Sequence, residues 1–133
     1  MSSVSVIRRL LVADAALTAV VPSARIFAGD VPLGTGLPAI AIFDTSDVPR
    51  NTISMKEVKR KAFGRVQVTV YTATYPQKKA ILKLVRQAAR NQYGVVGSTM
   101  VLSVLPDIVG PDLDDDEAKI YTQSRDFKVT YIE

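Results

Sequence analysis

Hydrophobic and polar residues alternate strictly in the middle of the chain. Between residues 65 and 72 the valines occupy even positions, and Arg65, Gln67 and Thr69 occupy odd ones. A period of two is typical of a strand that is buried on one face. Pro76 follows closely and cannot donate a backbone N–H to a neighbouring strand, so we expect this strand to end before it.

Residues 77–90 have the period of a helix instead. Apolar side chains recur every three or four positions, and the lysines and arginines of the segment fall on the opposite side. Thr74 is the predicted N-cap, and Gly94 is the predicted terminator, just past Tyr93. We expect this helix to cover the buried face of the strand before it.

A second helix and four more strands follow from the same patterns. The helix covers residues 4–19, and Asp14 could cap a restart within it before Pro22 ends it. The strands are expected at residues 25–28, 39–44, 99–105 and 120–132. The 39–44 run is apolar almost throughout, which indicates burial on both faces and a central place in the sheet. This order of elements predicts an α+β fold: a single domain with a mainly antiparallel or mixed β-sheet and two principal helices packed on one face.

Two polar segments interrupt these elements, and we expect both to be loops. Residues 45–62 are basic and have no sustained apolar period, whereas residues 107–118 are acidic. Long irregular segments are uncommon in compact domains. The basic loop is therefore expected to be mobile in the free protein or to be ordered by a partner.

The composition narrows the range of functions. The chain has 133 residues, which suits one domain with one core over residues 1–133. It has no cysteine and no histidine, which removes disulfides, zinc sites built from thiolates or imidazoles, and Cys-His or Ser-His catalysis. We identify no catalytic residues, no metal ligands and no cofactor site, and we expect that the protein is not an enzyme.

The N-terminal segment superficially resembles a secretion signal, because Arg8 and Arg9 precede an apolar run. Asp14 opposes that interpretation, since a carboxylate within a short apolar region is costly to insert. No segment approaches the roughly 20 apolar residues that a membrane span needs. We expect a soluble protein in a reducing compartment, with no membrane partner.

Charge is unevenly distributed along the chain. The total of 17 Lys+Arg against 13 Asp+Glu gives a net charge of +4, which is too mild by itself to indicate a nucleic-acid binder. However, residues 50–65 hold six cations against Glu57 alone, and residues 107–117 hold six carboxylates and no cation. The basic segment could contact DNA phosphates or another protein. The acidic run could bind a divalent cation, but it lacks EF-hand spacing, so a solvated loop is the favoured interpretation.

Three stretches of the chain resemble the tail completion, or tail terminator, family of tailed bacteriophages. They are residues 7–17 with 25–27 and 37–40, residues 66–72 with 80–89, and residues 121–129. Together they span most of the chain, as patterns rather than as catalytic signatures. The segments 50–61 and 112–117 have no counterpart in the family pattern, so the resemblance implies nothing about their roles.

The resemblance implies a small α+β subunit that forms a hexameric ring on the end of the tail tube. Such a ring ends tube polymerisation and provides the docking surface for the head. The implied partners are therefore the tail tube protein and the head–tail connector protein, with non-specific proximity to the genomic DNA in the channel. The implied place is the virion tail at the head–tail junction, after assembly in the host cytoplasm.

A ring of identical subunits needs two unlike patches that meet. The basic and acidic segments supply such a pair, and we predict that they form a subunit interface or face the tube or the DNA. The candidate residues are Arg50, Lys56, Lys59, Arg60, Lys61, Asp112, Asp114, Asp115 and Asp116. The alternative function is a nucleic-acid-binding module that uses the basic 50–65 segment as a phosphate-contacting arm.

Overall fold

The computed structural model describes residues 3–32, 34–50, 61–90, 92–96, 99–115 and 117–132, without the side chains of residues 46–50 and 61. The helices are α1 (Ser3–Ala13), α2 (Ala15–Thr18) and α3 (Tyr75–Ala89), and a 3-10 turn spans Ser23–Arg25. The strands are β1 (Ile26–Ala28), β2 (Ala39–Arg50), β3 (Lys61–Thr72), β4 (Gly94–Val96), β5 (Thr99–Val109), β6 (Leu113–Asp115) and β7 (Ile120–Ile132).

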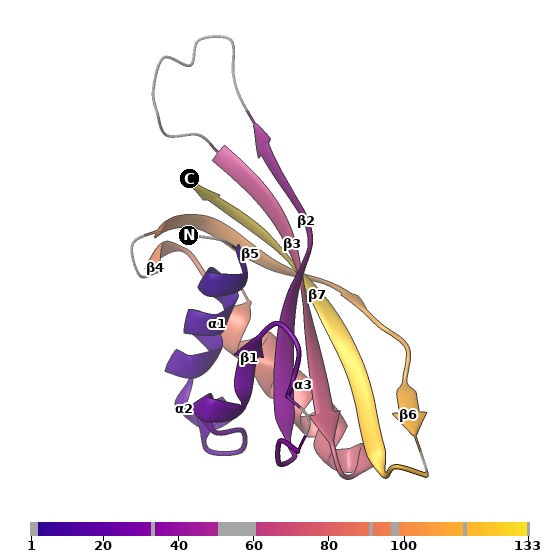
Figure 1. The fold of residues 1–133 in the computed structure, drawn as a ribbon. Coiled ribbons are helices and arrows are strands. Elements are labelled where there is room, and N and C mark those ends of the chain that lie inside the picture. Colours follow the sequence, from indigo (N-terminus) through magenta and orange to yellow (C-terminus); the bar gives the residue numbers. More distant parts are fainter. Residues whose placement is uncertain are drawn as a thin grey trace.

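The strands form one twisted, mixed sheet in the order β1-β2-β3-β7-β5-β4, and β6 pairs with β7 beside this path (Figure 1). β1 and β2 run parallel, and the other neighbouring pairs run antiparallel. The last strand along the chain, β7, thus lies between β3 and β5 in the middle of the sheet. The predicted α+β class is confirmed.

The core lies between one face of the sheet and the layer formed by α1 and α3. On β3, the three valines at positions 66, 68 and 70 are buried, as the period of two predicts. They belong to the same apolar cluster as Ile7 and Leu11 of α1 and Ile81 and Val85 of α3. The opposite face of the sheet carries no helix among the described residues and is called the open face below. The far ends of β2 and β3 extend past the helical layer (Figure 1).

Both predicted helix caps are present. Asp14 ends α1 and caps α2, because its Oδ1 accepts a hydrogen bond from the backbone N–H of Leu17 at 2.9 Å. Thr74 caps α3, with Oγ1 accepting from Gln77 N–H at 3.4 Å. The helix begins at Tyr75, two residues before the predicted start, since proline is tolerated in the first turn. Gly94 is not the terminator: α3 ends at Ala89, and Gly94, with φ of 104°, opens β4.

The predicted bounds of the basic loop were wrong at both ends. β2 continues to Arg50 and β3 starts at Lys61, and the ladder pairs these two residues with each other. Strand pairing there depends on backbone hydrogen bonds, so a polar sequence without an apolar period still forms a strand. Residues 51–60 lie outside the described residues, and the predicted mobility of this segment stays a prediction.

The acidic segment is also more regular than predicted. β5 runs through Pro106 to Val109, with a shift of register between these residues that absorbs the proline. β6 then pairs with the start of β7. The short strand β4 was not predicted. The 39–44 run is buried on both faces from Ala39 to Ile42. It lies between β1 and β3, so it is an interior strand of the sheet as predicted. However, its neighbour β1 is the edge strand, so the run does not lie at the centre of the sheet.

Candidate functional site

Lys78, in the first half of α3, is the one charged residue that is buried among those the structure describes. Its Nζ lies 2.7 Å from Asp112 Oδ1 and 2.8 Å from Asp114 Oδ1. The same ammonium group lies 4.4 Å from the centroid of the Tyr75 ring. Two carboxylates and an aromatic ring thus compensate one enclosed cation.

Lys79 extends this group, which we call the Lys78 cluster. Its Nζ lies 2.9 Å from Asp112 Oδ1 and 2.6 Å from Gln123 Oε1. The amide of Gln123 in turn donates to the backbone oxygen of Gly110 at 2.8 Å. These contacts attach the segment before β6 to both α3 and β7.

The Lys78 cluster stays charged over a wide range of pH. Hydrogen bonds from Lys78, and then from Lys79, lower the pKa of Asp112 to about 2. Burial alone lowers the pKa of Lys78, but the hydrogen bonds with Asp112 and Asp114 outweigh it and the pKa is raised. A general acid or base works best with a pKa near the operating pH, so these two shifts suit a permanent ion-pair network rather than proton transfer.

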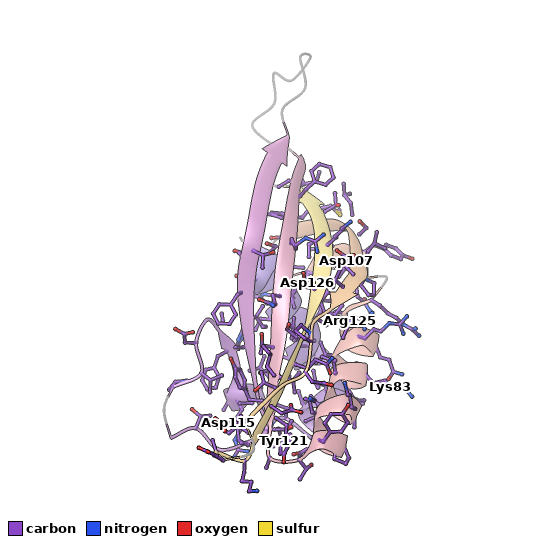
Figure 2. All side chains as sticks on the ribbon, turned by 90° about the vertical axis from the view of Figure 1, so that its right-hand side faces the viewer. Lys83, Asp107, Asp115, Tyr121, Arg125 and Asp126 are labelled. Carbon is purple, nitrogen blue, oxygen red and sulfur yellow. The ribbon has the colours of Figure 1, made fainter. Side chains whose placement is uncertain are left out.

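A second charged group lies on the open face and joins three strands. Arg65 of β3 contacts Asp107 of β5, and its Nη1 lies 3.1 Å from Asp126 Oδ2 of β7. Hydrogen bonds with Asp107, and then with Asp126, raise the pKa of Arg65. Figure 2 shows the two carboxylates one above the other on this side of the molecule. We call this the Arg65 cluster.

Arg125 of β7 forms no ion pair with a carboxylate of the described residues. Its Nε has no hydrogen-bond partner among the described residues. Burial lowers the pKa of Arg125, and the nearby charge of Arg86 on α3 lowers it further. Lys83 projects from α3 on the same side of the molecule (Figure 2). This side therefore presents positive charge that the described residues do not neutralise.

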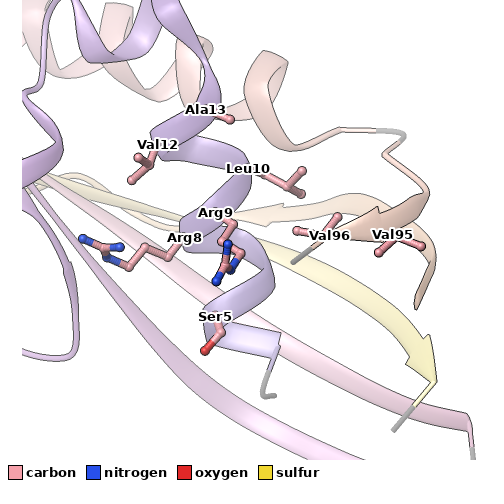
Figure 3. A pocket seen from close by; sticks show the side chains of 8 residues that line it. All are labelled: Ser5, Arg8, Arg9, Leu10, Val12, Ala13, Val95 and Val96. Carbon is pink, nitrogen blue, oxygen red and sulfur yellow. The ribbon is translucent and has the colours of Figure 1, made fainter. Parts of the chain in front are cut away.

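A groove of about 700 Å³ lies between α1 and β4. Its apolar lining includes Leu10 of α1, which points toward Val95 and Val96 of β4, and Arg9 lies beside Leu10 (Figure 3). Arg8 also lines the groove, but its Nε donates to the backbone oxygen of Ile26 at 3.2 Å, so it is attached to β1. We call this hollow the α1–β4 groove.

The structure places the predicted site residues unequally. Asp112 and Asp114 lie in the Lys78 cluster, so lysines of their own chain already compensate their charge. Asp115 is exposed, and its Oδ1 accepts from the backbone N–H groups of residues 117 and 118, both at 3.1 Å. Arg50 and Lys61 end the β2–β3 ladder, without described side chains. Lys56, Lys59, Arg60 and Asp116 lie outside the described residues.

Sequence reasoning missed two features. It placed Lys78 on the polar side of α3, although the side chain is 0% exposed. A weak signal for a buried lysine was the adjacent pair Lys78-Lys79, because it lies in the first turns of a helix that is expected to pack against the sheet. The α1–β4 groove was missed because β4 was not predicted.

The described residues contain no group of three or more histidine, cysteine or acidic side chains that could hold a metal ion. Among the described helices, none has the length and apolar character to cross a membrane.

Comparison with known proteins identifies the class. The family model described as "Tail completion protein gp17" matches residues 5–106, which extend from α1 to most of β5. No curated protein matches the chain significantly. Among solved structures, one chain of the "Virion of native gene transfer agent (GTA) particle" is similar, with a TM-score of 0.71 and 17% sequence identity, over 99% of this chain and 96% of that chain.

The match covers most of the chain, so this chain belongs to the tail completion protein family. It is therefore a bacteriophage structural tail protein, as its resemblance to tail completion proteins predicted. At 17% identity, the likeness to the gene transfer agent chain shows that the fold is shared over nearly the whole length of both chains. β6 and β7 lie beyond the matched residues, so the Lys78 cluster is only partly inside the region that the family model describes.

Proposed function

We propose that this protein forms a closed ring on the end of the tail tube, ends tube polymerisation and provides the surface to which the head connector docks. Membership of the tail completion family carries the proposal. The shared fold with a chain of a virion particle supports it, because that chain too is part of an assembled particle. The protein works by binding, and no catalysis is assigned to it.

The proposed partners follow from this place in the virion. They are further copies of the chain, in a hexameric ring, the tail tube protein on one side and the head–tail connector on the other. The fold supports a ring because its exposed surfaces differ: the α1–β4 groove has an apolar lining, whereas the open face carries the Arg65 cluster. Unlike patches allow head-to-tail contacts, which close into a ring when the rotation between successive copies completes a full turn.

The direct test is the assembly of the purified chain. We expect closed rings of one size by electron microscopy and one matching mass by mass photometry. When the chain is added to tube protein during polymerisation, we expect tubes with a ring at one end only and a lower mean length. Tubes that keep growing in the presence of the chain would contradict the proposed function.

The basic segment stays a proposed contact region. We propose that Lys59, Arg60 and Lys61 face a neighbouring subunit, the tube or the DNA in the channel. Reversal of these three residues to glutamate should then weaken ring formation or capping, and the defect should depend on salt. A steep loss of oligonucleotide affinity between low and physiological salt in the unmodified chain would favour the nucleic-acid-binding function instead.

A further inference from the structure

The Lys78 cluster fixes the direction of the side chain at Leu113. Asp112 and Asp114 both reach Lys78 Nζ, at 2.7 and 2.8 Å. Successive side chains of an extended strand point to opposite sides, so Leu113, between these two carboxylates, is directed away from Lys78. It is 63% exposed. A large apolar side chain is thus held in solvent by ion pairs to its two neighbours.

Asp115 lies two residues further along β6 and therefore shares the direction of Leu113. Its Oδ1 accepts two backbone hydrogen bonds from the turn that follows, which fixes the carboxylate in place. No cation pairs with it among the described residues. Leu113 and Asp115 together form what we call the β6 knob, one apolar and one anionic group on a strand that the ladder with β7 supports.

The α1–β4 groove has the complementary chemistry. Leu10, Val95 and Val96 line it, and Val95 is 68% exposed although it is large and apolar. Arg9 lies beside Leu10 and has neither an ion pair nor a hydrogen bond within the described part of the chain (Figure 3). A hollow with an apolar lining and an arginine that makes no ion pair or hydrogen bond among the described residues, Arg9, thus occurs on the same molecule as an apolar knob with one unpaired carboxylate.

We propose that the β6 knob of one copy docks into the α1–β4 groove of the next copy, with Leu113 against Leu10 and Val95, and Asp115 facing Arg9. This rests on the proposed function, because it names the contact that joins subunits of the ring. Figure 1 shows β6 on the opposite side of the molecule from α1 and β4, so one copy cannot fill its own groove. Two different patches on opposite sides give a head-to-tail contact, which can close into a ring.

A second copy of this chain would cover both the β6 knob and the α1–β4 groove, because it carries the surface that fits each of them. One different partner protein would cover only one of the two. Burial of exposed apolar side chains provides most of the affinity of such contacts. A single rim pair of charges contributes mainly to the rate and direction of association. The inference also differs from a pairing of the acidic run with the basic segment, because Asp112 and Asp114 here serve to orient Leu113 and do not touch the neighbour.

The first test uses the absence of native cysteine. A chain with both Val95→Cys and Leu113→Cys should form a ladder of disulfide-linked oligomers under mild oxidation. Each copy then offers a knob cysteine to one neighbour and a groove cysteine to the other. Each single variant should give no ladder. The matched control is Val95→Cys with Leu105→Cys, since Leu105 is also an exposed apolar strand residue, at 49%, but it is not on the knob. All three positions are exposed, so the folded core is left intact.

The second test exchanges the charges. Arg9→Glu should lower the rate of assembly at low salt by about ten-fold, since like charges then face each other across the contact. Adding Asp115→Arg to the same chain should restore it. Lys83→Glu is the matched control, because it removes an exposed cation from α3 and should leave the rate unchanged.

The outcomes separate this inference from the proposed function. The proposed contact is overturned if rings form but the Val95–Leu113 pair gives no ladder, or if the control pair gives an equal ladder. The proposed ring is not contradicted by either result. A ladder from the Val95–Leu113 pair in a chain that never caps tubes overturns the proposed function and supports the contact. If neither rings nor a ladder form, both proposals fail.

Discussion

Each side of the sheet carries an ion-pair group in which one cation contacts two aspartates, but the surroundings of the two groups differ. On the helical side, Lys78 lies within 2.8 Å of two aspartates, and its side chain is fully enclosed. On the open face, Arg65 also has two aspartates, but its side chain is 30% exposed. Water therefore screens the second group and substitutes for a lost partner, whereas it cannot reach the ammonium group of the first.

The comparison teaches that the number of ion pairs says little about their importance. What matters is whether the charge left behind after a change can be hydrated. The Lys78 cluster also attaches a short strand that has few other contacts, whereas the Arg65 cluster lies on strands already joined by long ladders.

The largest effect is expected from a charge placed between the sheet and α3. Val68→Asp should destabilise the fold by several kcal/mol or prevent folding, because the carboxylate is buried without a partner. Thr69→Asp is the matched control, since position 69 lies on the open face, and it should still fold. Thermal melting by circular dichroism measures both. An unchanged melting temperature for Val68→Asp would show that the two faces of β3 do not differ as described.

The next effect concerns the enclosed cation. Changing both Asp112 and Asp114 to Asn should lower the melting temperature more than any change to the Arg65 cluster, because Lys78 then stays buried without a countercharge. Lys78→Met should cost less, since it removes the buried charge and leaves the aspartates, which are partly exposed and can be hydrated. The reverse order, with Lys78→Met the more damaging, would contradict the proposed role of burial.

Acid should weaken the same cluster. The pKa of Asp112 is about 2 in the folded chain against an ordinary value of 3.8, so its ionised form stabilises the fold above about pH 4. This contribution is lost as the pH falls from about 4 toward 2. The difference in melting temperature between the unmodified chain and Asp112→Asn should therefore shrink over this interval. A difference that stays constant down to pH 2 would mean that the pKa is not lowered.

The smallest effect is expected on the open face. Arg65→Met should change the melting temperature less than the Asp112 and Asp114 changes do, because the side chains of Asp107 and Asp126 are 24% and 20% exposed and water can hydrate them once the guanidinium is removed. Added salt should reduce the difference further, whereas it should leave the Lys78 cluster largely unaffected. A loss as large as that from the Asp112 and Asp114 changes would remove the distinction between the two sides.

Periodicity predicted the elements that bury one face. β3, α1 with its restart at Asp14, and α3 with its Thr74 cap all followed from apolar spacing and capping residues. The far half of β2 and all of β6 did not, because their residues are polar and form strands through the backbone hydrogen bonds of a neighbour. The pattern of apolar and polar residues within a segment does not show whether a strand distant in sequence will pair with it.

The candidate site was predictable only in outline. The uneven charge singled out the acidic run, and two of its aspartates do form ion pairs. Their partner was expected in the basic segment of a neighbouring subunit, and that contact stays a prediction. Within their own chain they pair with Lys78 of α3, 34 residues before Asp112. Which lysine of a helix is enclosed depends on a segment folding over it, and that cannot be derived from helical spacing alone. The roles of the basic residues at the subunit contact stay predictions.

The position of β7 has a consequence for synthesis on the ribosome. β3 and β5 are both made before β7, yet each pairs with β7 and not with the other. The helices and the β2–β3 ladder can form while the chain is still emerging, since their contacts are local, but the core stays open until residues near Phe127 and Val129 arrive. The edge of β3 that pairs with β7 therefore stays without its partner from the time β3 is made until the last residues of the chain arrive. When β7 of one copy is completed, a neighbouring copy on the same message that still lacks its own β7 presents an open β3 edge, so the two copies are exposed to exchange of β7 strands.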